Sequence, residues 1–483
     1  MKVAQTSLIV FISKLFGSIL GFTATVYFAR ELGAEIYGVY AVFIAVLAWL
    51  KVGGRVGINA GIIKRISEGK EQGQYLTAGI FLITTLITGV ILLIFILNSY
   101  FEAYLSGFGE YSSVSVIWFL VPMLALYIAY IPIKSTLHGE GKVHIAGILN
   151  PIEVILKSLF QIGLVFLGYS LAGMVIGYAA GIIVVTAIGV LFVTVRPQLP
   201  KVHHFRSIYN YAKYAWFGDL KSQAFNDVDI LILGAFVSQS LVGVYAVAWS
   251  LSRFIDMFSV AVSQAMFPEI SNISSQDSKQ KAAGLIEDSF AYTGIIAIPG
   301  FIGGFILDER LMRIYSGEFI QGTEVLWILL LSILFYGYLK QCLNALNALN
   351  RPDLAFRANF VFIAANVILN VVLIWQLSWV GAAIASAISS GIGLVISYVL
   401  LKRIIVFTLP LREVVKQGIA ALVMAGVTIA LQWAIETADI IQNNFLIVII
   451  LVAVSAGLYF ALLLGMSSGF RGTVRRNIPL DPF

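Results

Sequence analysis

Charged side chains interrupt the long apolar stretches of this sequence, and their chemistry is the first indication of function. Each central Lys, Arg or Asp costs about 2.5–3.5 kcal/mol in a membrane-spanning helix, so these groups must face water or a partner. Ammonium and guanidinium groups in a hydrated cavity would bind an anion such as a phosphate, whereas carboxylates would hold Na⁺ or a proton. These residues are Lys14, Lys51, Arg55, Lys157, Lys213, Asp219, Lys221, Asp227, Asp229, Arg253, Asp256 and Lys340.

We expect the cations and acids on four of the predicted helices to line one cavity. Lys51 and Arg55 are spaced i, i+4, and Arg253 and Asp256 are spaced i, i+3, so each pair projects from one helix face. For Lys14 and Arg55, which lie near predicted cytoplasmic ends, the alternative is that the long side chains reach the lipid headgroups. The predicted cavity residues are Lys14, Lys51, Arg55, Asp219, Lys221, Arg253 and Asp256.

Four further charged residues are expected in different surroundings. Lys157 lies near a predicted cytoplasmic end, so contact with headgroups is favoured. Lys340 is expected to be an isolated packing residue or to reach the headgroups in the same way. Asp227 and Asp229 lie in the outer half of their helix and could couple transport to Na⁺ or H⁺, with capping or surface placement as the alternative.

The composition indicates a membrane protein. Of the 483 residues, 59% are hydrophobic and 12% are charged, whereas soluble domains are roughly 45–50% apolar and about 25% charged. A disordered chain, a secreted disulfide scaffold and an ordinary soluble enzyme are thereby excluded. The net charge of +6 is explained by Lys and Arg in cytoplasmic loops, so no nucleic-acid partner follows from it.

Apolar runs bounded by polar or Gly/Pro-rich turns predict about 14 membrane-spanning helices. The predicted spans are Leu8–Ala29, Gly38–Ala60, Leu76–Leu97, Val114–Ile133, Ile145–Leu167, Leu171–Val195, Ile208–Phe236, Leu241–Phe267, Leu285–Leu307, Thr323–Leu346, Ala355–Leu377, Val380–Leu401, Val414–Ile435 and Phe445–Gly465. Basic residues alternate from loop to loop as the positive-inside rule requires, which predicts a cell-membrane protein with both termini in the cytoplasm. Glu102, Glu110, Glu436 and Asp439 are expected in outer loops without basic neighbours.

An internal repeat divides these helices. A shift of 205 residues lays Gly38–Val42 onto the identical Gly243–Val247, and a shift of 208 lays Gly173–Ile176 over Gly381–Ile384. We therefore expect an all-α polytopic membrane protein with two parallel six-helix lobes followed by two C-terminal helices. The predicted boundaries are 1–195 for the N-lobe, 196–207 for a cytoplasmic linker, 208–403 for the C-lobe, 404–466 for the last two helices and 467–483 for a basic cytoplasmic tail.

The 205-residue shift also sets charges of opposite sign against each other. It places Lys14 opposite Asp219 and Lys51 opposite Asp256. Cations in one lobe thus correspond to acids in the other, which predicts that charges can pair across the repeat axis when the lobes approach.

Several enzymatic and metal-binding motifs are missing from the sequence. No stretch fits a phosphate-binding loop of an ATPase, because His138–Lys142 has the wrong spacing. The four histidines, including His203 and His204, have no accompanying Cys or carboxylate pattern, so we expect no metal site and no bound cofactor.

Four segments resemble a known family: Ala29–Gly33 (ARELG), Tyr37–Tyr40 (YGVY), Leu311–Phe319 (LMRIYSGEF) and Leu346–Pro352 (LNALNRP). They closely resemble the polysaccharide flippases, the Wzx-like members of the multidrug/oligosaccharidyl-lipid/polysaccharide (MOP) exporter superfamily, in order and helix position along nearly the whole chain. The resemblance implies a MATE-like fold in which the first, second, seventh and eighth helices line the cavity. By this resemblance, the cations expected to line the cavity are Lys14, Lys51, Arg55, Lys221 and Arg253.

The predicted function is a flippase that moves a lipid-linked oligosaccharide, on a polyprenyl or dolichyl phosphate or pyrophosphate, to the outer leaflet by alternating access. It would serve surface polysaccharide synthesis or protein N-glycosylation. The expected partners are this substrate, membrane lipids and glycan-assembly enzymes, with the protein a monomer. An organic-cation antiporter of the same superfamily is the alternative, although an acidic aromatic cavity would suit it better. A membrane glycan polymerase or ligase is the second alternative, disfavoured by the lack of a catalytic constellation.

Overall fold

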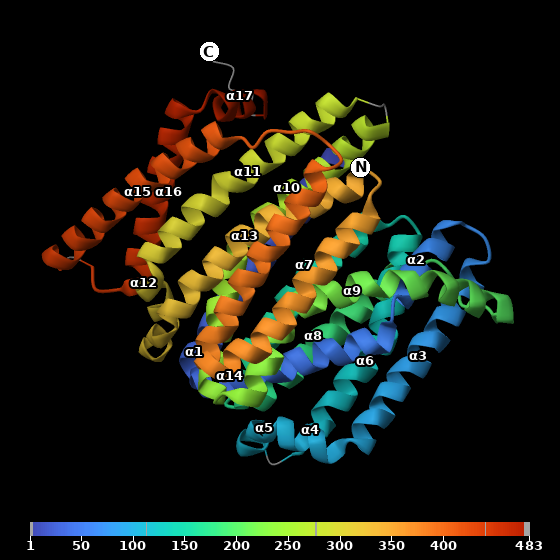
Figure 1. Ribbon diagram of the computed structural model, residues 1–483. Coiled ribbons are helices and arrows are strands. Elements are labelled where there is room, and N and C mark those ends of the chain that lie inside the picture. Colours follow the sequence, from blue (N-terminus) through green and yellow to red (C-terminus); the bar gives the residue numbers. More distant parts are fainter. Residues whose placement is uncertain (1–2, 113, 276–277, 440, 478–483) are drawn as a thin grey trace. The chain divides into compact units, whose positions relative to one another are not determined.

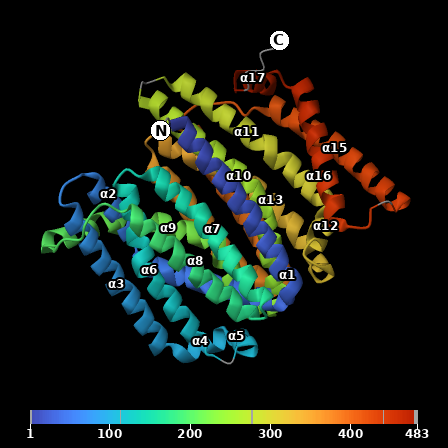
Figure 2. The same ribbon diagram turned by 180° about the vertical axis from the view of Figure 1, so that it is seen from behind.

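The computed structural model describes residues 3–112, 114–275, 278–439 and 441–477, although the side chains of residues 3–12, 14–15, 214–222, 224, 274–275, 473 and 475–477 lie outside that description. Within these ranges all regular secondary structure is helical (Figures 1 and 2). The chain divides into two compact units, Met1–Gly243 and Val244–Phe483. Each unit is built from helices too apolar to face water along their length.

The first unit is built on one long, kinked helix. Its helices are α1 (Val3–Arg55), α2 (Ile58–Ser67), α3 (Gln72–Ile96), α4 (Asn98–Tyr104), α5 (Ser106–Tyr111), α6 (Ile117–Gly139), α7 (Val143–Phe166), α8 (Ser170–Phe192) and α9 (Val202–Phe236). Gly33 kinks α1 because its φ of 79° belongs to the left-handed region that glycine adopts without steric cost. Phe28 of α1 is buried against Val165 of α7 and Met174 of α8, which fixes these three helices together.

The second unit ends in a helical hairpin. Its helices are most of α10 (Gln239–Ser275), then α11 (Lys279–Ile306), α12 (Asp308–Arg313), the 3₁₀-helix η1 (Gly317–Gly322), α13 (Thr323–Ala348), α14 (Pro352–Lys402), α15 (Leu411–Ala438), α16 (Asn444–Met466) and α17 (Ser468–Asn477). Asn443 starts α16 by accepting the Phe445 N–H at 3.0 Å. Figure 1 shows α15 and α16, the red helices, side by side next to α11.

The helices agree with the predicted spans but do not fix their number. Eleven helices among the described residues are long and apolar enough to cross a membrane. Two of these contain kinks, at Gly33 in α1 and at Ser378 in α14, near the predicted boundaries between consecutive spans. The protein is therefore a multi-pass membrane protein, while the count of 14 crossings stays a prediction.

The backbone repeats where the sequence repeats. Ser170 at the start of α8 has a φ of 45°, and Ser378, 208 residues later, has a φ of 56°. A positive φ is uncommon for a non-glycine residue, so its recurrence at positions 208 residues apart agrees with the 208-residue shift.

The loop that follows α8 and the loop that follows α14 make equivalent hydrogen bonds, each to an earlier helix of its own repeat. The Gln198 N–H donates to Thr77 Oγ1 of α3 at 3.1 Å, and the Thr408 N–H donates to Glu287 of α11 at 2.6 Å. Both residues of the second bond lie 210 positions after their counterparts in the first. Each repeat therefore lays its outgoing segment on its own third helix.

The identical five-residue segments of the repeat begin with glycine for a steric reason. A Cβ on Gly38 of α1 would lie 1.8 Å from the Gln239 carbonyl oxygen, and a Cβ on Gly243 would lie 1.9 Å from that of Ala34. Gln239 and Gly243 follow Ala34 and Gly38 by the same 205 residues, so the contact is reciprocal. Glycine is needed here because the two backbones touch, as at the close helix crossings of membrane proteins.

The compact units do not coincide with the predicted lobes. The helix α9, assigned from sequence to the second block, packs on α1, α2 and α3, and so belongs to the first unit. Contact clusters and sequence repeats are different properties, and the division into two six-helix lobes stays a prediction.

Candidate anion-binding site

Lys51 is held by tyrosines inside the first unit. Its ammonium lies 4.5 Å from the centroid of the Tyr127 ring and donates to Tyr127 Oη at 3.3 Å. Tyr127 Oη is in turn 3.1 Å from Tyr178 Oη, so α1, α6 and α8 meet at this point. Ring faces attract a cation without cancelling its charge.

Two further lysines join the same group of tyrosines. Lys157 of α7 lies 4.9 Å from the centroid of the Tyr178 ring. Lys134 of α6 lies 5.4 Å from the centroid of Tyr130, the residue one helical turn before it. The rings of Tyr127 and Tyr130 are 5.8 Å apart, which joins the three lysines through aromatic contacts. We call Lys51, Arg55, Lys134 and Lys157, with Tyr127, Tyr130 and Tyr178, the cationic cluster.

The acids near this cluster are fewer than its cations. Glu153 of α7 accepts a hydrogen bond from Tyr130 Oη, and the charges of Glu153, Arg55, Lys157 and Asp227 all act on Lys51. Among the described residues, no carboxylate forms a salt bridge with Lys51 or Lys157. The cluster therefore carries net positive charge in a membrane-spanning region, which is suited to a phosphate or another anion.

The structure describes only some of the predicted cavity residues, and the cavity itself stays a prediction. The structure brings Lys51 and Arg55 within electrostatic range of each other. The side chains of Lys14, Asp219 and Lys221 lie outside the described residues, so their predicted place in the cavity stays untested. Lys157 is expected at the lipid headgroups, but its ammonium lies over Tyr178, because α7 packs against α8 along this face.

Sequence reasoning missed Lys134, Glu153 and the tyrosines. Lys134 is expected in a cytoplasmic loop, whereas α6 continues to Gly139 and keeps it one turn from Tyr130. Tyr-x-x-x-Lys occurs at Tyr130 and Lys134 and again 206 residues later at Tyr336 and Lys340, but also at Tyr209 and Lys213 and at Tyr398 and Lys402, so only its recurrence at the repeat spacing could have indicated Lys134.

The second unit carries an equivalent Tyr–Lys pair, Tyr336 and Lys340, in which a carboxylate neutralises the charge of the lysine. Lys340 of α13 lies 4.8 Å from the Tyr336 ring centroid and donates to both carboxylate oxygens of Asp256 on α10, at 2.7 and 2.9 Å. The expectation that Lys340 is isolated is therefore wrong. Asp256, predicted to pair across the repeat axis, has a partner within its own unit because α10 and α13 face each other there.

The two units thus differ in charge at equivalent positions. Asp256 stands where Lys51 stands in the first repeat, while Val260 and Ala365 take the places of Arg55 and Lys157. Arg253 is exposed, and its charge acts on Lys340. The excess of cations over acids at these positions is accordingly found in the first unit.

The two acids proposed for ion coupling differ in environment. Asp229 of α9 is buried, with 5% of its surface exposed. Asp227 is partly exposed and accepts a hydrogen bond from Gln223 on the same helix. A role in ion coupling for either residue stays a proposal.

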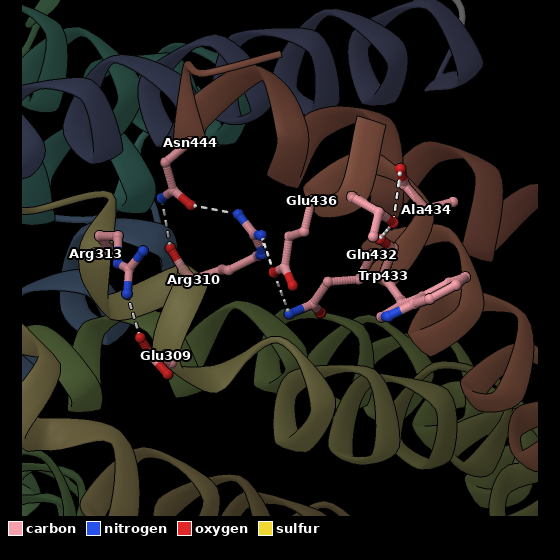
Figure 3. A network of polar contacts seen from close by, with 9 residues as sticks. Glu309, Arg310, Arg313, Gln432, Trp433, Ala434, Glu436 and Asn444 are labelled. Atoms are coloured by element: carbon pink, nitrogen blue, oxygen red, sulfur yellow. Dashed lines mark hydrogen bonds and ion pairs between the residues drawn. The ribbon is translucent and has the colours of Figure 1, made fainter. Parts of the chain in front are cut away.

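A polar network closes one end of the second unit (Figure 3). Arg310 of α12 donates to Glu436 of α15 and to Asn444 Oδ1 of α16 at 3.2 Å, and the Asn444 amide donates back to the Arg310 carbonyl at 2.9 Å. The expectation that Glu436 lacks a basic neighbour is wrong. The network fastens the trailing hairpin to the end of α11 and α12.

A metal site is not expected from the sequence, because no carboxylate accompanies the histidines there, but in the structure one does. Glu71, just before α3, has its Oε2 atom 3.4 Å from His203 Nε2 and 3.3 Å from His204 Nε2. A carboxylate therefore does accompany two of the histidines, although it is 132 residues away from His203 in sequence.

The helical architecture and the eleven candidate spans among the described residues define a multi-pass membrane protein. Residues 27–321 match the family model described as polysaccharide biosynthesis protein. A probable low-salt glycan biosynthesis flippase of Haloferax volcanii is 31% identical, over 77% of each chain, and a probable flippase of the same organism is 28% identical over 76% of this chain and 77% of its own. The chain belongs to this polysaccharide biosynthesis family, and the two relatives are named as flippases rather than enzymes.

Solved structures agree on the fold. The inward closed conformation of the lipid II flippase MurJ superposes with a TM-score of 0.78 at 20% identity, covering 97% of this chain and 100% of that one. An inward-facing multidrug transporter of the MATE family gives 0.61 at 14% identity, covering 80% and 95%. The predicted MATE-like fold is therefore confirmed.

Proposed function

We propose that this protein transfers a lipid-linked oligosaccharide from the cytoplasmic to the outer leaflet by alternating access. The observation that carries the proposal is the cationic cluster, which places an excess of positive charge inside a membrane-spanning unit. The names of the two Haloferax relatives support the substrate class, since both are flippases and one serves glycan biosynthesis.

The cluster would bind the phosphate or pyrophosphate that joins glycan to lipid. Arg55 offers a planar fork for two phosphate oxygens, and the lysines offer point charges on flexible stems. Because ring faces hold Lys51 and Lys157, an entering phosphate displaces no salt bridge formed with them by the part of the chain that the structure describes. The lipid tail stays in the bilayer while the head group crosses.

Further parts of the proposal concern energy and surroundings. Turnover would be driven by the membrane potential or by Na⁺ or H⁺ bound at Asp227 or Asp229. Both termini would lie in the cytoplasm, and a monomer would work beside glycan-assembly enzymes. An organic-cation antiporter remains the alternative, but a net positive cluster repels such substrates.

The test is genetic and leaflet-specific. Deletion of the gene should cause lipid-linked oligosaccharide to accumulate in the cytoplasmic leaflet, detected by a membrane-impermeant glycan-binding probe on oriented vesicles. The Lys51→Ala and Lys157→Ala variants should fail to restore export while still inserting in the membrane. Lys70→Ala, which removes an exposed cation before α3, is the matched control and should restore it.

Two results would count against the proposal. Full export in the Lys51→Ala, Lys157→Ala double variant would remove the cluster from the mechanism. Normal glycans with increased sensitivity to organic cations after deletion would favour the antiporter.

A further inference from the structure

We propose that Glu71, His203 and His204 form a binding site for a divalent transition-metal ion of the zinc type. Glu71 immediately precedes α3, and the two histidines lie in the first turn of α9. The site lies outside the cationic cluster, and the inference is independent of what the protein transports.

The distances between the side-chain atoms fit such an ion. Two ligand atoms on a tetrahedral Zn²⁺ with bonds of about 2.0–2.1 Å lie about 3.3–3.4 Å apart. Glu71 Oε2 is 3.4 Å from His203 Nε2 and 3.3 Å from His204 Nε2. The three ligand atoms all lie within 4.8 Å of one another, so a small movement of one imidazole completes the geometry.

The surroundings of His204 hold its ring beside Glu71. The His204 ring is fully buried against the edge of Tyr75, with ring centroids 4.7 Å apart. Its Nδ1 atom accepts the Lys201 N–H at 2.9 Å and lies 3.2 Å from the Lys201 carbonyl oxygen. Metal on Nε2 would leave the ring proton on Nδ1, so this bond would be exchanged for one from Nδ1–H to that carbonyl, a backbone contact that orients metal-binding imidazoles.

The ligand set selects the class of ion. Two imidazoles and one carboxylate suit Zn²⁺ and neighbouring transition metals, whereas Ca²⁺ and Mg²⁺ require mostly oxygen ligands. The exposed residues Lys70 and Lys201 raise the local positive potential, which further disfavours ions held by charge alone. Three protein ligands leave the fourth position open to water, and the side chains of Glu71 and His203 are 47% and 54% exposed, so an ion can enter.

A bound ion would fasten the start of α9 to α3. The chain between α8 and α9 already follows α3 through the bonds of Gln198 to the Gly73 carbonyl, at 3.2 Å, and to Thr77. Both bonds come from the one Gln198 N–H, and a single hydrogen bond of this kind contributes about 0.5–1.5 kcal/mol. An ion bound to Glu71 beside α3 and to His203 and His204 in α9 would link the two helices. It would thereby hold the segment 193–201 on α3 through the transport cycle.

The experiment measures metal binding by the purified full-length chain in nanodiscs after removal of any affinity tag. Zn²⁺ should bind with one equivalent per chain in competition with a chromophoric chelator, and Co²⁺ should give the intense visible absorption of a tetrahedral site. Glu71→Gln and His203→Ala should each weaken binding at least tenfold. His144→Ala, at another exposed histidine, is the matched control and should leave it unchanged.

A structural measurement gives a second, independent test. Amide hydrogen exchange across residues 193–205 should slow when Zn²⁺ is added to the wild type, and should not change in His203→Ala. Both substituted residues are exposed, so loss of binding in these variants is not loss of folding. Absence of a saturable equivalent, or equal binding by all the variants, would overturn the proposal.

Discussion

The ion pair between Asp256 and Lys340 makes a quantitative prediction. Both side chains are largely withdrawn from solvent, with 17% and 20% of their surfaces exposed, and both Asp256 oxygens bind the same ammonium. Removal of one member of a buried pair costs about 3–5 kcal/mol, because the other charge stays buried without compensation. Replacement of both by apolar or neutral groups of similar size costs little.

We therefore expect Asp256→Asn to lower the free energy of unfolding by about 3–5 kcal/mol, a large part of the roughly 5–15 kcal/mol that stabilises a typical folded protein. The double variant Asp256→Asn, Lys340→Met should recover most of this loss. Denaturant unfolding of the purified variants, followed by tryptophan fluorescence, measures both values, and the coupling energy follows from the double-mutant cycle.

Two outcomes would refute this reasoning. An Asp256→Asn protein as stable as the wild type would show that the pair contributes nothing. A double variant as unstable as the single one would show that Asp256 stabilises the unit by some other contact. If the double variant regains stability but not glycan export, the Asp256–Lys340 pair acts in transport as well as in folding.

The other predictions concern the close crossing, the end network and a buried glutamate. Gly38→Ala should destabilise the protein by about 1–3 kcal/mol or more, because its Cβ meets backbone, whereas Gly89→Ala, which meets open space, should change unfolding little. Glu436→Gln should lower the unfolding temperature more than Arg310→Met, because it leaves the charge of Arg310, 10% exposed, without a carboxylate, whereas Arg310→Met leaves Glu436, 50% exposed, in contact with water. Burial raises the pKa of Glu140, but an ion pair with Lys142 and hydrogen bonds from the 194–195 backbone and Thr194 outweigh it and lower the pKa below 4.5. The stability from Glu140 should be complete above pH 4.5, fall as pH drops through the lowered pKa and vanish in Glu140→Gln, as measured by melting temperature against pH.

The helices could be predicted from the sequence because each is a long apolar run that ends at polar or turn-forming residues. The kinks at Gly33 and Ser378 fall between predicted spans for the same reason. The partition into compact units could not be predicted from the sequence. It depends on which helices α9 contacts, and the composition of α9 does not indicate these.

The candidate site was only partly predictable. Depth in a span indicated Lys51, but a lysine that reaches the headgroups and one that lies over a tyrosine ring look alike in sequence, so the contact of Lys157 with Tyr178 could not be predicted. The pairing of Lys340 depends on α13 facing α10, and the approach of Glu71 to His203 depends on a chain segment folding back along α3. Such contacts join residues far apart in sequence, where periodicity carries no information.

The neutralised pair in the second unit has a consequence for stoichiometry. Both repeats keep the Tyr–Lys pair, yet the carboxylate of Asp256 pairs with the lysine of the second repeat. Under the proposed function, a charged lipid head would therefore meet an uncompensated lysine at only one of these two pairs, and we expect each cycle to carry one glycan rather than two.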